Sequence, residues 1–342
     1  MGMITFDTVT LRIPLEELNS LDSAKFVPTK GGKTLTTTKT DTPIGFSPLV
    51  VSDGTLIVQH SAKALHDNYK DGINITNFYD VFDRIRHITT IDKSVLANSK
   101  PYRIDVNNNI DITDFGLSKQ EILNIVAAHH TNTNYTLSHY DKTDNSGIVL
   151  TLKAKTTNNR VSLYDKEKDL KKKANTHFIE SLSNPNKLIS DFQNIIRVET
   201  NVRTKKCIVE KLNVKGEYNY LSCLQSTENV NANNLLKICT KKDIYNLYDI
   251  ELYSHYCKCN PIEIKGLLST FCEYNYDVNL VKSYLKHLNK WTRQNLYDNW
   301  SNKNGKNIEG LFLFAKAQRN KTDYRTSNEI FSKFIELLKI AA

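Results

Sequence analysis

Residues 161–173 read VSLYDKEKDLKKK, and this stretch decides how the first part of the chain is interpreted. Val161 and Leu163 alternate with polar residues, which predicts a strand with one buried face. From Lys166 to Lys173 the period changes, and the pattern becomes that of a basic helix. Tyr164 is therefore expected where a strand ends and a helix begins, with several lysines close behind it.

A tyrosine at such a junction has two interpretations. Its phenol can attack a phosphodiester and hold the strand covalently, provided that cations and a metal stabilise the charge on phosphorus. The simpler alternative is a tyrosine that ends a strand before a solvated run of charge. On this stretch alone the simpler alternative is favoured.

The composition favours a two-domain protein with a polyanionic partner. The chain has 342 residues, a formal charge of +9 and a pI near 9.0. Nucleic acid is the commonest partner of basic proteins, although many soluble proteins are mildly basic. The six cysteines all lie at or after Cys207, which is typical of reduced thiols rather than a disulfide framework. We find neither a signal pattern nor an apolar run long enough for a membrane span, so we expect a cytoplasmic protein.

Period-two patterns indicate most of the strands. They cover residues 4–13, the hairpin 49–51 and 55–59 around Asp53-Gly54, and residues 102–106, 110–112, 135–139, 148–153 and 195–203. Helical spacing is found at 77–88 and, after a capping-box pattern at Ser118, up to residue 128. Residues 28–43 are interpreted as a loop or an irregular hairpin. From residue 213 helical spacing dominates, so we place a domain boundary near residue 212.

Three residues with oxygen ligands lie on predicted strands: Gln59, Asp111 and Glu199. If they converge they would form a site for a hard divalent cation such as Mg²⁺ or Mn²⁺; taken singly, each is better explained as a structural group. His129 and His130 are explained by a helix C-terminus. The sequence contains no Walker loop, nucleophile elbow or dinucleotide fingerprint, so ATPase, hydrolase and dehydrogenase functions lack support.

In order and spacing the chain resembles the gene II/gene X family of replication initiators, which serve filamentous phages and related plasmids. The similar segments are 7–14, 59–65, 110–113, 163–169 and 197–203. They match the family's opening strand, its Glu-x-Ser-x-Lys segment (with Gln59 in place of the carboxylate), its Ile-Asp strand, its Tyr-x-Lys block and its Arg-x-Glu strand. The match covers roughly the first 210 residues in fragments.

The resemblance implies rolling-circle replication initiation by site- and strand-specific DNA nicking and joining. Tyr164 would be the nucleophile that forms a 5′-phosphotyrosyl link, and Lys166 would contact the scissile phosphate or stabilise the phenolate. A divalent Mg or Mn ion would be held by Asp111, Glu199 and Gln59, although an amide holds a cation less tightly than a carboxylate. His60 could replace Gln59, but the pleat directs it to the opposite face. DNA phosphates would be bound by Ser61, Lys63, Arg197 and Arg203.

The resemblance also implies an α+β fold. Residues 1–212 would form an HUH-like nicking domain, an antiparallel sheet with helices on one face. Beyond the matched segments, helical spacing predicts a mainly helical domain at residues 213–342. It is a candidate for binding DNA or a partner through Lys282, Lys286, Lys290, Arg293, Trp291, Tyr297 and Trp300, with an ordinary amphipathic bundle as the alternative. Expected partners are single-stranded DNA, the double-stranded origin and host helicase or polymerase, with no membrane.

Two other functions remain open. A non-catalytic DNA-binding copy-control regulator would keep the fold without the metal, and Gln59 favours it. The retained Tyr164, Lys166, Asp111 and Glu199 favour the enzyme instead. An RNA-binding scaffold has only the positive charge in its favour.

Overall fold

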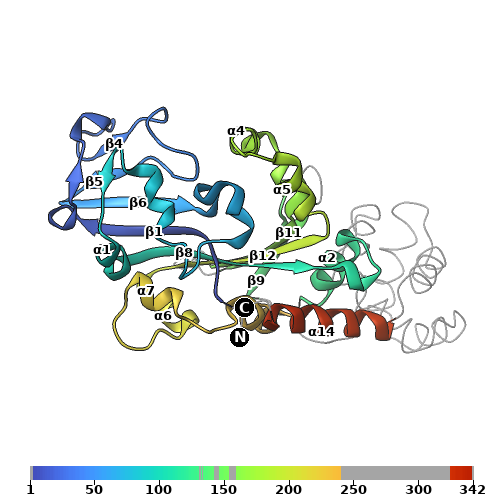
Figure 1. Ribbon diagram of the computed structural model, residues 1–342. Helices are drawn as coiled ribbons and strands as arrows, with labels where there is room; N and C mark the ends of the chain where they lie inside the picture. Colours follow the sequence, from blue (N-terminus) through green and yellow to red (C-terminus); the bar gives the residue numbers. More distant parts are fainter. Residues whose placement is uncertain are drawn as a thin grey trace, which may run out of the picture. The chain divides into compact units, whose positions relative to one another are not determined.

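An antiparallel sheet of ten strands dominates the part of the chain that the structure describes (Figure 1). The structure is a computed structural model, and it describes residues 3–130, 132, 134–141, 146–153, 159–239 and 324–340. The sheet order is β3-β4-β5-β6-β1-β8-β12-β11-β10-β9. Its strands are β1 (Phe6–Pro14), β3 (Phe26–Pro28), β4 (Leu35–Thr37), β5 (Val50–Ser52), β6 (Thr55–Ser61), β8 (Lys100–Asp111), β9 (Tyr135–His139), β10 (Gly147–Leu152), β11 (Arg160–Asp165) and β12 (Ile195–Arg203); β2 (Ser20–Leu21) and β7 (Thr89–Thr90) pair separately.

Short helices connect these strands. The α-helices are α1 (Lys93–Asn98), α2 (Lys119–Ala128), α3 (Lys166–Leu170), α4 (Thr176–Glu180), α5 (Pro185–Asp191), α6 (Lys205–Leu212), α7 (Tyr220–Leu224), α8 (Val230–Ile238) and α14 (Tyr324–Ile340). The 3₁₀ helices are η1 (Leu15–Glu17), η2 (Ser23–Lys25), η3 (Ala62–Asp71), η4 (Asp80–Ile85), η5 (Thr113–Phe115) and η6 (Lys173–Asn175). No helix among the described residues is both long enough and apolar enough to cross a membrane.

The described residues fall into two compact units. Of the described residues, the first unit takes in those within 3–120 and 132–238 and the end of α14 from Phe334, while residues 121–130, Cys239 and residues 324–333 belong to the second. The whole sheet and every residue discussed below as part of a site lie in the first unit. The boundary near residue 212 stays a prediction. The basic and aromatic residues between 282 and 300 lie outside the described residues.

Strand β12 shows how the sheet separates its two faces. Arg197, Glu199 and Asn201 point to one face, which we call the polar face, because side chains alternate along a strand. Val198, Thr200 and Val202 point to the other, the core face. There the Asn231 side chain of α8 accepts a hydrogen bond from Thr200 Oγ1 and donates to the Val198 carbonyl. Helix α8 therefore covers the core face of the central strands.

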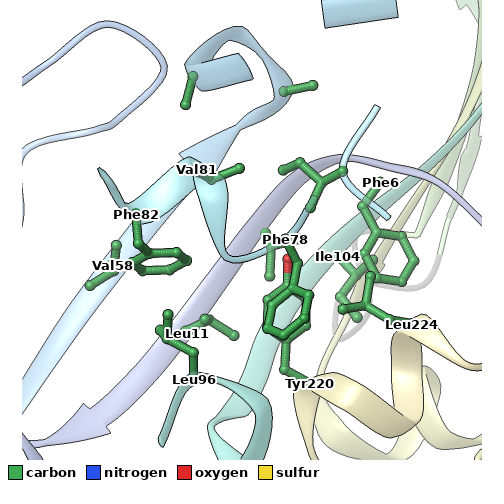
Figure 2. Close-up of a cluster of buried hydrophobic side chains, with 14 of the residues drawn as sticks. Phe6, Leu11, Val58, Phe78, Val81, Phe82, Leu96, Ile104, Tyr220 and Leu224 are labelled. Atoms are coloured by element: carbon green, nitrogen blue, oxygen red, sulfur yellow. The ribbon is translucent and has the colours of Figure 1, made fainter. Parts of the chain in front are cut away.

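The core of the β1–β6 half contains aliphatic side chains from the strands and aromatic side chains from the connections (Figure 2). Leu11 and Val58 of the sheet are fully buried beside Phe82 of η4, and Phe78 meets the Tyr220 ring of α7 edge-on at 5.6 Å. Full burial of such a side chain contributes about 1.5–3 kcal/mol. This cluster fixes β1 and β6 against the connections and so holds the polar face in place.

The predicted α+β class with an antiparallel sheet is confirmed. The Asp53-Gly54 hairpin joins β5 to β6 as expected, with both turn residues at positive φ. Residues 102–106 and 110–112 form one strand, β8, because β8 pairs along its length with β1 and β12. The predicted helix at 77–88 is a shorter 3₁₀ helix, η4. Helices lie on both faces of the sheet rather than on one: η3 and α5 contribute to the polar face and α8 to the core face.

Candidate active site

Tyr164 lies where strand β11 gives way to helix α3, as its sequence context predicts. Asp165 caps that helix by accepting a hydrogen bond from the Lys168 backbone N–H at 3.1 Å. The Lys119 ammonium binds the same carboxylate at 2.6 Å, and both side chains are largely buried. The cap stops the strand at a fixed residue and so fixes the position of the tyrosine ring.

The Tyr164 phenol lies between a carboxylate and an ammonium group. Its hydroxyl donates a hydrogen bond of 2.5 Å to Glu199 Oε1, and Lys166 Nζ lies 3.3 Å from the same phenol oxygen. Lys166 also binds Asp169 Oδ2 at 2.9 Å. Glu199 comes from β12, where its neighbour across the ladder is Ser162 of β11. Tyr164 and Lys166 therefore lie together, as their places in the sequence predict, and they are joined by Glu199, which the sequence assigns to a metal site.

Arg197 forms the floor of this cluster. It pairs directly with Tyr164 across the β11–β12 ladder and is fully buried. Its Nη1 lies 2.7 Å from Asp7 Oδ1 and 3.9 Å from Glu199 Oε1, and it donates to the Tyr69 hydroxyl at 2.9 Å. One guanidinium therefore holds two carboxylates and one phenol on the polar face, so its removal would leave buried charges uncompensated.

Tyr140 covers the Tyr164 ring. The two rings stack with centroids 4.1 Å apart and planes 5° apart. Between them in the sheet lies Gly147, which pairs with Tyr164 and whose carbonyl accepts a hydrogen bond from the Tyr140 N–H. A Cβ on Gly147 would lie 2.5 Å from the Tyr164 Cβ, closer than such atoms approach in proteins. The glycine is what allows the second tyrosine to close over the first, and Tyr164 is left only 2% exposed.

The electrostatics of the cluster separate its two carboxylates. Burial and the Asp7 charge raise the pKa of Glu199 to about 7, against the opposing effects of Lys166 and Arg197. Burial also acts to raise the pKa of Asp7, but Arg197, Lys166 and Lys63 outweigh it and lower that pKa below its ordinary value. Burial and Glu199 raise the pKa of Tyr164 well above its ordinary value. Near neutral pH the phenol therefore carries its proton, and Glu199 is the group poised to accept it.

The other predicted phosphate-binding residues have separate surroundings. Lys63 Nζ binds Asn175 Oδ1 at 2.7 Å, and burial together with Lys166 lowers its pKa. Asn175 also bonds the Asp169 carbonyl, so Lys63 borders the Tyr164 cluster. The Ser61 hydroxyl donates to the Gly45 carbonyl at 3.2 Å. Arg203 Nε donates to Asn201 Oδ1 at 3.0 Å, at the far end of β12 from Arg197.

The three predicted metal ligands are not brought together. Asp111 ends β8 and accepts hydrogen bonds from the Thr113 N–H and hydroxyl at 2.9 and 2.6 Å. Glu199 pairs with Asn107, which lies four residues before Asp111 on β8. Asp111 and the position opposite Glu199 are therefore separated by roughly 13 Å along the strand. The Gln59 amide donates to Ser47 at 3.0 Å, and its neighbour across the ladder is Thr10. Within the described ranges, no three His, Cys, Asp or Glu side chains are grouped to hold a metal ion.

His60 does not replace Gln59 as a ligand. The pleat places it on the core face, 1% exposed, with its ring 4.9 Å from that of Phe82. Neither ring nitrogen has a hydrogen-bond partner among the described residues. Burial lowers the pKa of His60 to about 3, so this histidine is a neutral core residue.

Sequence reasoning missed three members of the cluster: Asp7, Tyr69 and Tyr140. Asp7 opens the first of the segments on which the resemblance rests and lies near the start of strand β1, so its place in the sequence was a usable signal. Tyr69 belongs to η3, and its hydroxyl receives the Arg197 hydrogen bond; no local pattern distinguishes it from the other tyrosines. Tyr140 follows a short edge strand and has no local signal either.

Comparisons with known proteins add a weak structural likeness. No family model matches the chain, and no curated protein matches it. Among solved structures, the chain is similar to a rolling circle replication initiator protein from Geobacillus stearothermophilus, with 14% sequence identity and a TM-score of 0.32. The match covers 70% of this chain and 88% of that one. At this level of similarity we derive no residue role from it.

Proposed function

We propose that this chain is a rolling-circle replication initiator, a DNA endonuclease and strand transferase with Tyr164 as its nucleophile. One observation carries the proposal: the Tyr164 hydroxyl donates to Glu199 at 2.5 Å and has Lys166 Nζ 3.3 Å away. A nucleophile, a base within hydrogen-bond reach and a cation at the reacting oxygen are the parts that covalent catalysis needs. The order of the sequence segments, with its resemblance to phage and plasmid initiators, gives independent support.

The proposed chemistry is a transesterification. The Tyr164 oxygen attacks phosphorus as its proton passes to the Glu199 carboxylate, and a tyrosyl–phosphate bond forms. The bond from phosphorus to the 3′-oxygen breaks, and that oxygen takes a proton from solvent and leaves as a 3′-hydroxyl. Lys166 stabilises the negative charge that develops at the phenol oxygen. Rejoining is the reverse: a 3′-hydroxyl attacks phosphorus, and the phenol oxygen recovers the proton from Glu199.

The raised pKa of Tyr164 explains why a base is needed. Burial and Glu199 disfavour the phenolate, so a free phenolate would be too rare to act near neutral pH. A carboxylate with a pKa of about 7 is ionised in about half of the molecules at that pH, and it is close to the optimum for a general base. Glu199 is therefore proposed to act on the phenol proton.

Access to Tyr164 requires movement in this proposal. The ring is 2% exposed beneath Tyr140, whose hydroxyl donates to Asp169 Oδ1 at 3.3 Å. A phosphodiester reaches the phenol oxygen only after Tyr140 moves aside. The same motion would release Asp169 from Tyr140 while leaving its ion pair with Lys166. Displacement of such a cover on substrate binding is a common way to keep a nucleophile out of water until DNA is present.

Dependence on Mg²⁺ or Mn²⁺ remains a prediction of the resemblance. The three donors expected from the sequence do not meet at one point, and the proton transfer described above involves the chain's own residues. The proposed substrates are single-stranded DNA and the double-stranded origin of a phage or plasmid replicon. Host helicase and polymerase contacts are proposed on the resemblance alone.

The test is formation of a covalent adduct. Purified protein is incubated with labelled single-stranded oligonucleotides from the candidate origin of its own replicon, with Mg²⁺, with Mn²⁺ and with a chelator. The wild type and Tyr140→Phe should form the adduct, and Tyr164→Phe should not. Binding without an adduct under every condition would favour the non-catalytic regulator, and an adduct that survives in Tyr164→Phe would exclude Tyr164.

A further inference from the structure

A row of arginines crosses the polar face beyond the Tyr164 cluster, with one arginine on each of four neighbouring strands. Arg160 begins β11 and pairs with Asn201, and Arg203 lies two residues further along β12. Arg203 pairs with Arg103 of β8, which pairs with Thr10 of β1. The fourth member, Arg12, lies two residues after Thr10 and so points to the same face. We call Arg160, Arg203, Arg103 and Arg12 the arginine row.

Most of the positive charge of the row is not neutralised by an ion pair among the described residues, the exception being Arg103. Arg103 and Arg203 are direct cross-strand partners, an arrangement in which like charges destabilise a sheet. Asp105 binds Arg103 at 2.5 Å, whereas Arg203 receives only the neutral oxygen of Asn201. Among the described residues, Arg12, Arg160 and Arg203 form no ion pair. An anionic occupant would offset the repulsion that the fold leaves in place.

The row also presents an aromatic ring. The register between β8 and β1 shifts by one residue at Tyr102, which is the extra residue of β8. Its side chain is 51% exposed. The Arg12 guanidinium lies 4.6 Å from the centre of its ring. Exposed cations beside an exposed ring are what proteins use to hold single strands, with phosphates on the cations and an unpaired base on the ring. A paired base in a duplex has no face free to stack on Tyr102.

We propose that the arginine row is the binding track for the single-stranded DNA that flanks the cleavage site. This inference rests on the proposed function, because it assigns the row to the same substrate strand. Arg160 and Tyr164 lie on the same strand, four residues or roughly 13 Å apart, with both side chains on the polar face. A strand attached at Tyr164 therefore meets the row at Arg160 and continues across β12 and β8 to Arg12.

The test measures how affinity depends on salt. Wild-type protein, the row variant (Arg12→Gln, Arg160→Gln and Arg203→Gln) and a control variant are titrated against a labelled single-stranded oligonucleotide and its duplex at several salt concentrations. The control (Lys205→Gln, Lys206→Gln and Lys237→Gln) removes the same charge from α6 and α8. Arg103 is kept because its ion pair with Asp105 supports the fold. Circular dichroism confirms that the variants are folded.

The expected result is specific to the row variant. Its affinity for the single strand falls at least about tenfold, and the slope of log affinity against log salt falls by about 2, at about 0.7 per lost phosphate contact. The control variant keeps the wild-type slope. Three results would overturn the assignment. They are an unchanged salt slope in the row variant, an equal loss of affinity in the row and control variants, and a loss of affinity for the duplex alone.

The same proteins separate this inference from the nickase proposal. At saturating oligonucleotide the row variant should still form the covalent adduct, because the Tyr164 cluster is untouched. If the salt slope is smaller in the row variant than in wild type but wild type never forms an adduct, the nickase proposal fails and the binding track stands. If an adduct forms and the slope does not depend on the row, the track fails alone.

Discussion

Replacement of Glu199 by glutamine should stabilise the fold and, at the same time, slow the proposed chemistry strongly. The glutamine side chain would keep an oxygen to accept the Tyr164 hydrogen bond, but it cannot ionise or accept the phenol proton. Burial and the Asp7 charge make the ionised form of Glu199 unfavourable in the native state, even with Lys166 and Arg197 beside it. A neutral isostere removes that cost.

The size and sign of the effect follow from the pKa. Below pH 4.5 Glu199 is protonated in both the folded and the unfolded chain, and its contribution to the free energy of unfolding is at its maximum. Between pH 4.5 and about 7 the folded chain keeps a proton that the unfolded chain has lost, so stability falls as pH rises. A pKa shift of this size corresponds to about 3 kcal/mol in the free energy of unfolding. We reduce this to about 2–3 kcal/mol because the Glu199 side chain is 17% exposed and therefore partly screened by solvent.

Urea unfolding of wild type and Glu199→Gln at pH 5, 6, 7 and 8, followed by circular dichroism, measures this difference. The variant should gain little at pH 5 and about 2–3 kcal/mol at pH 8. Groups common to both proteins, such as His60, cancel in the difference. Adduct formation should slow by roughly 100–10,000-fold, the usual contribution of a general base, and the wild-type rise in rate toward pH 7 should disappear.

Three outcomes would refute this reasoning. A difference in stability that does not grow with pH would mean that Glu199 is not held near a pKa of 7. A variant less stable than wild type at pH 8 would mean that the ionised form of Glu199 is stabilised by Arg197 and Lys166. A variant that forms the adduct at the wild-type rate would show that the phenol proton goes elsewhere.

Three further predictions concern the surroundings of the cluster. Tyr140→Ala should expose Tyr164 and raise the rate of adduct formation severalfold at saturating oligonucleotide, and an unchanged rate would show that Tyr140 does not limit access. Gly147→Ala should cost about 1–3 kcal/mol in urea unfolding, because the added Cβ lies 2.5 Å from that of Tyr164; a neutral change would mean that the strands separate easily. His60→Phe should lessen the loss of stability between pH 6.5 and 5, since the folded wild type keeps this histidine neutral, with a pKa of about 3, while the unfolded chain protonates it; equal pH profiles would contradict its neutral burial.

The sequence predicts the parts of the site that depend on one strand at a time. The change of period after Leu163 places Tyr164 at the end of a strand with Lys166 two residues later. Alternation in the strand 195–203 places Arg197 and Glu199 on one face. These relations need only the local geometry of a strand and the first turn of a helix.

The remaining relations depend on which strands are neighbours and in what register. The distance between Asp111 and Glu199 follows from the pairing of Glu199 with Asn107, and one-dimensional patterns do not contain that pairing. Asp7 joins the site because β1 lies beside β8, which in turn lies beside β12. Tyr140 joins it because Gly147 leaves room for a second ring. Each of these contacts is set by tertiary structure rather than by local pattern.

The most direct test of the central claim is to identify the residue that carries the DNA. Trypsin cleaves after Arg160 and after Lys166, so Tyr164 is the one tyrosine in the peptide VSLYDK, while Tyr140 falls in a different peptide. Mass spectrometry of the digested adduct, after nuclease trimming, should find a nucleotide phosphate on that peptide, linked to the tyrosine. A nucleotide on a peptide containing Tyr140 or any other residue, with VSLYDK unmodified, would contradict the account.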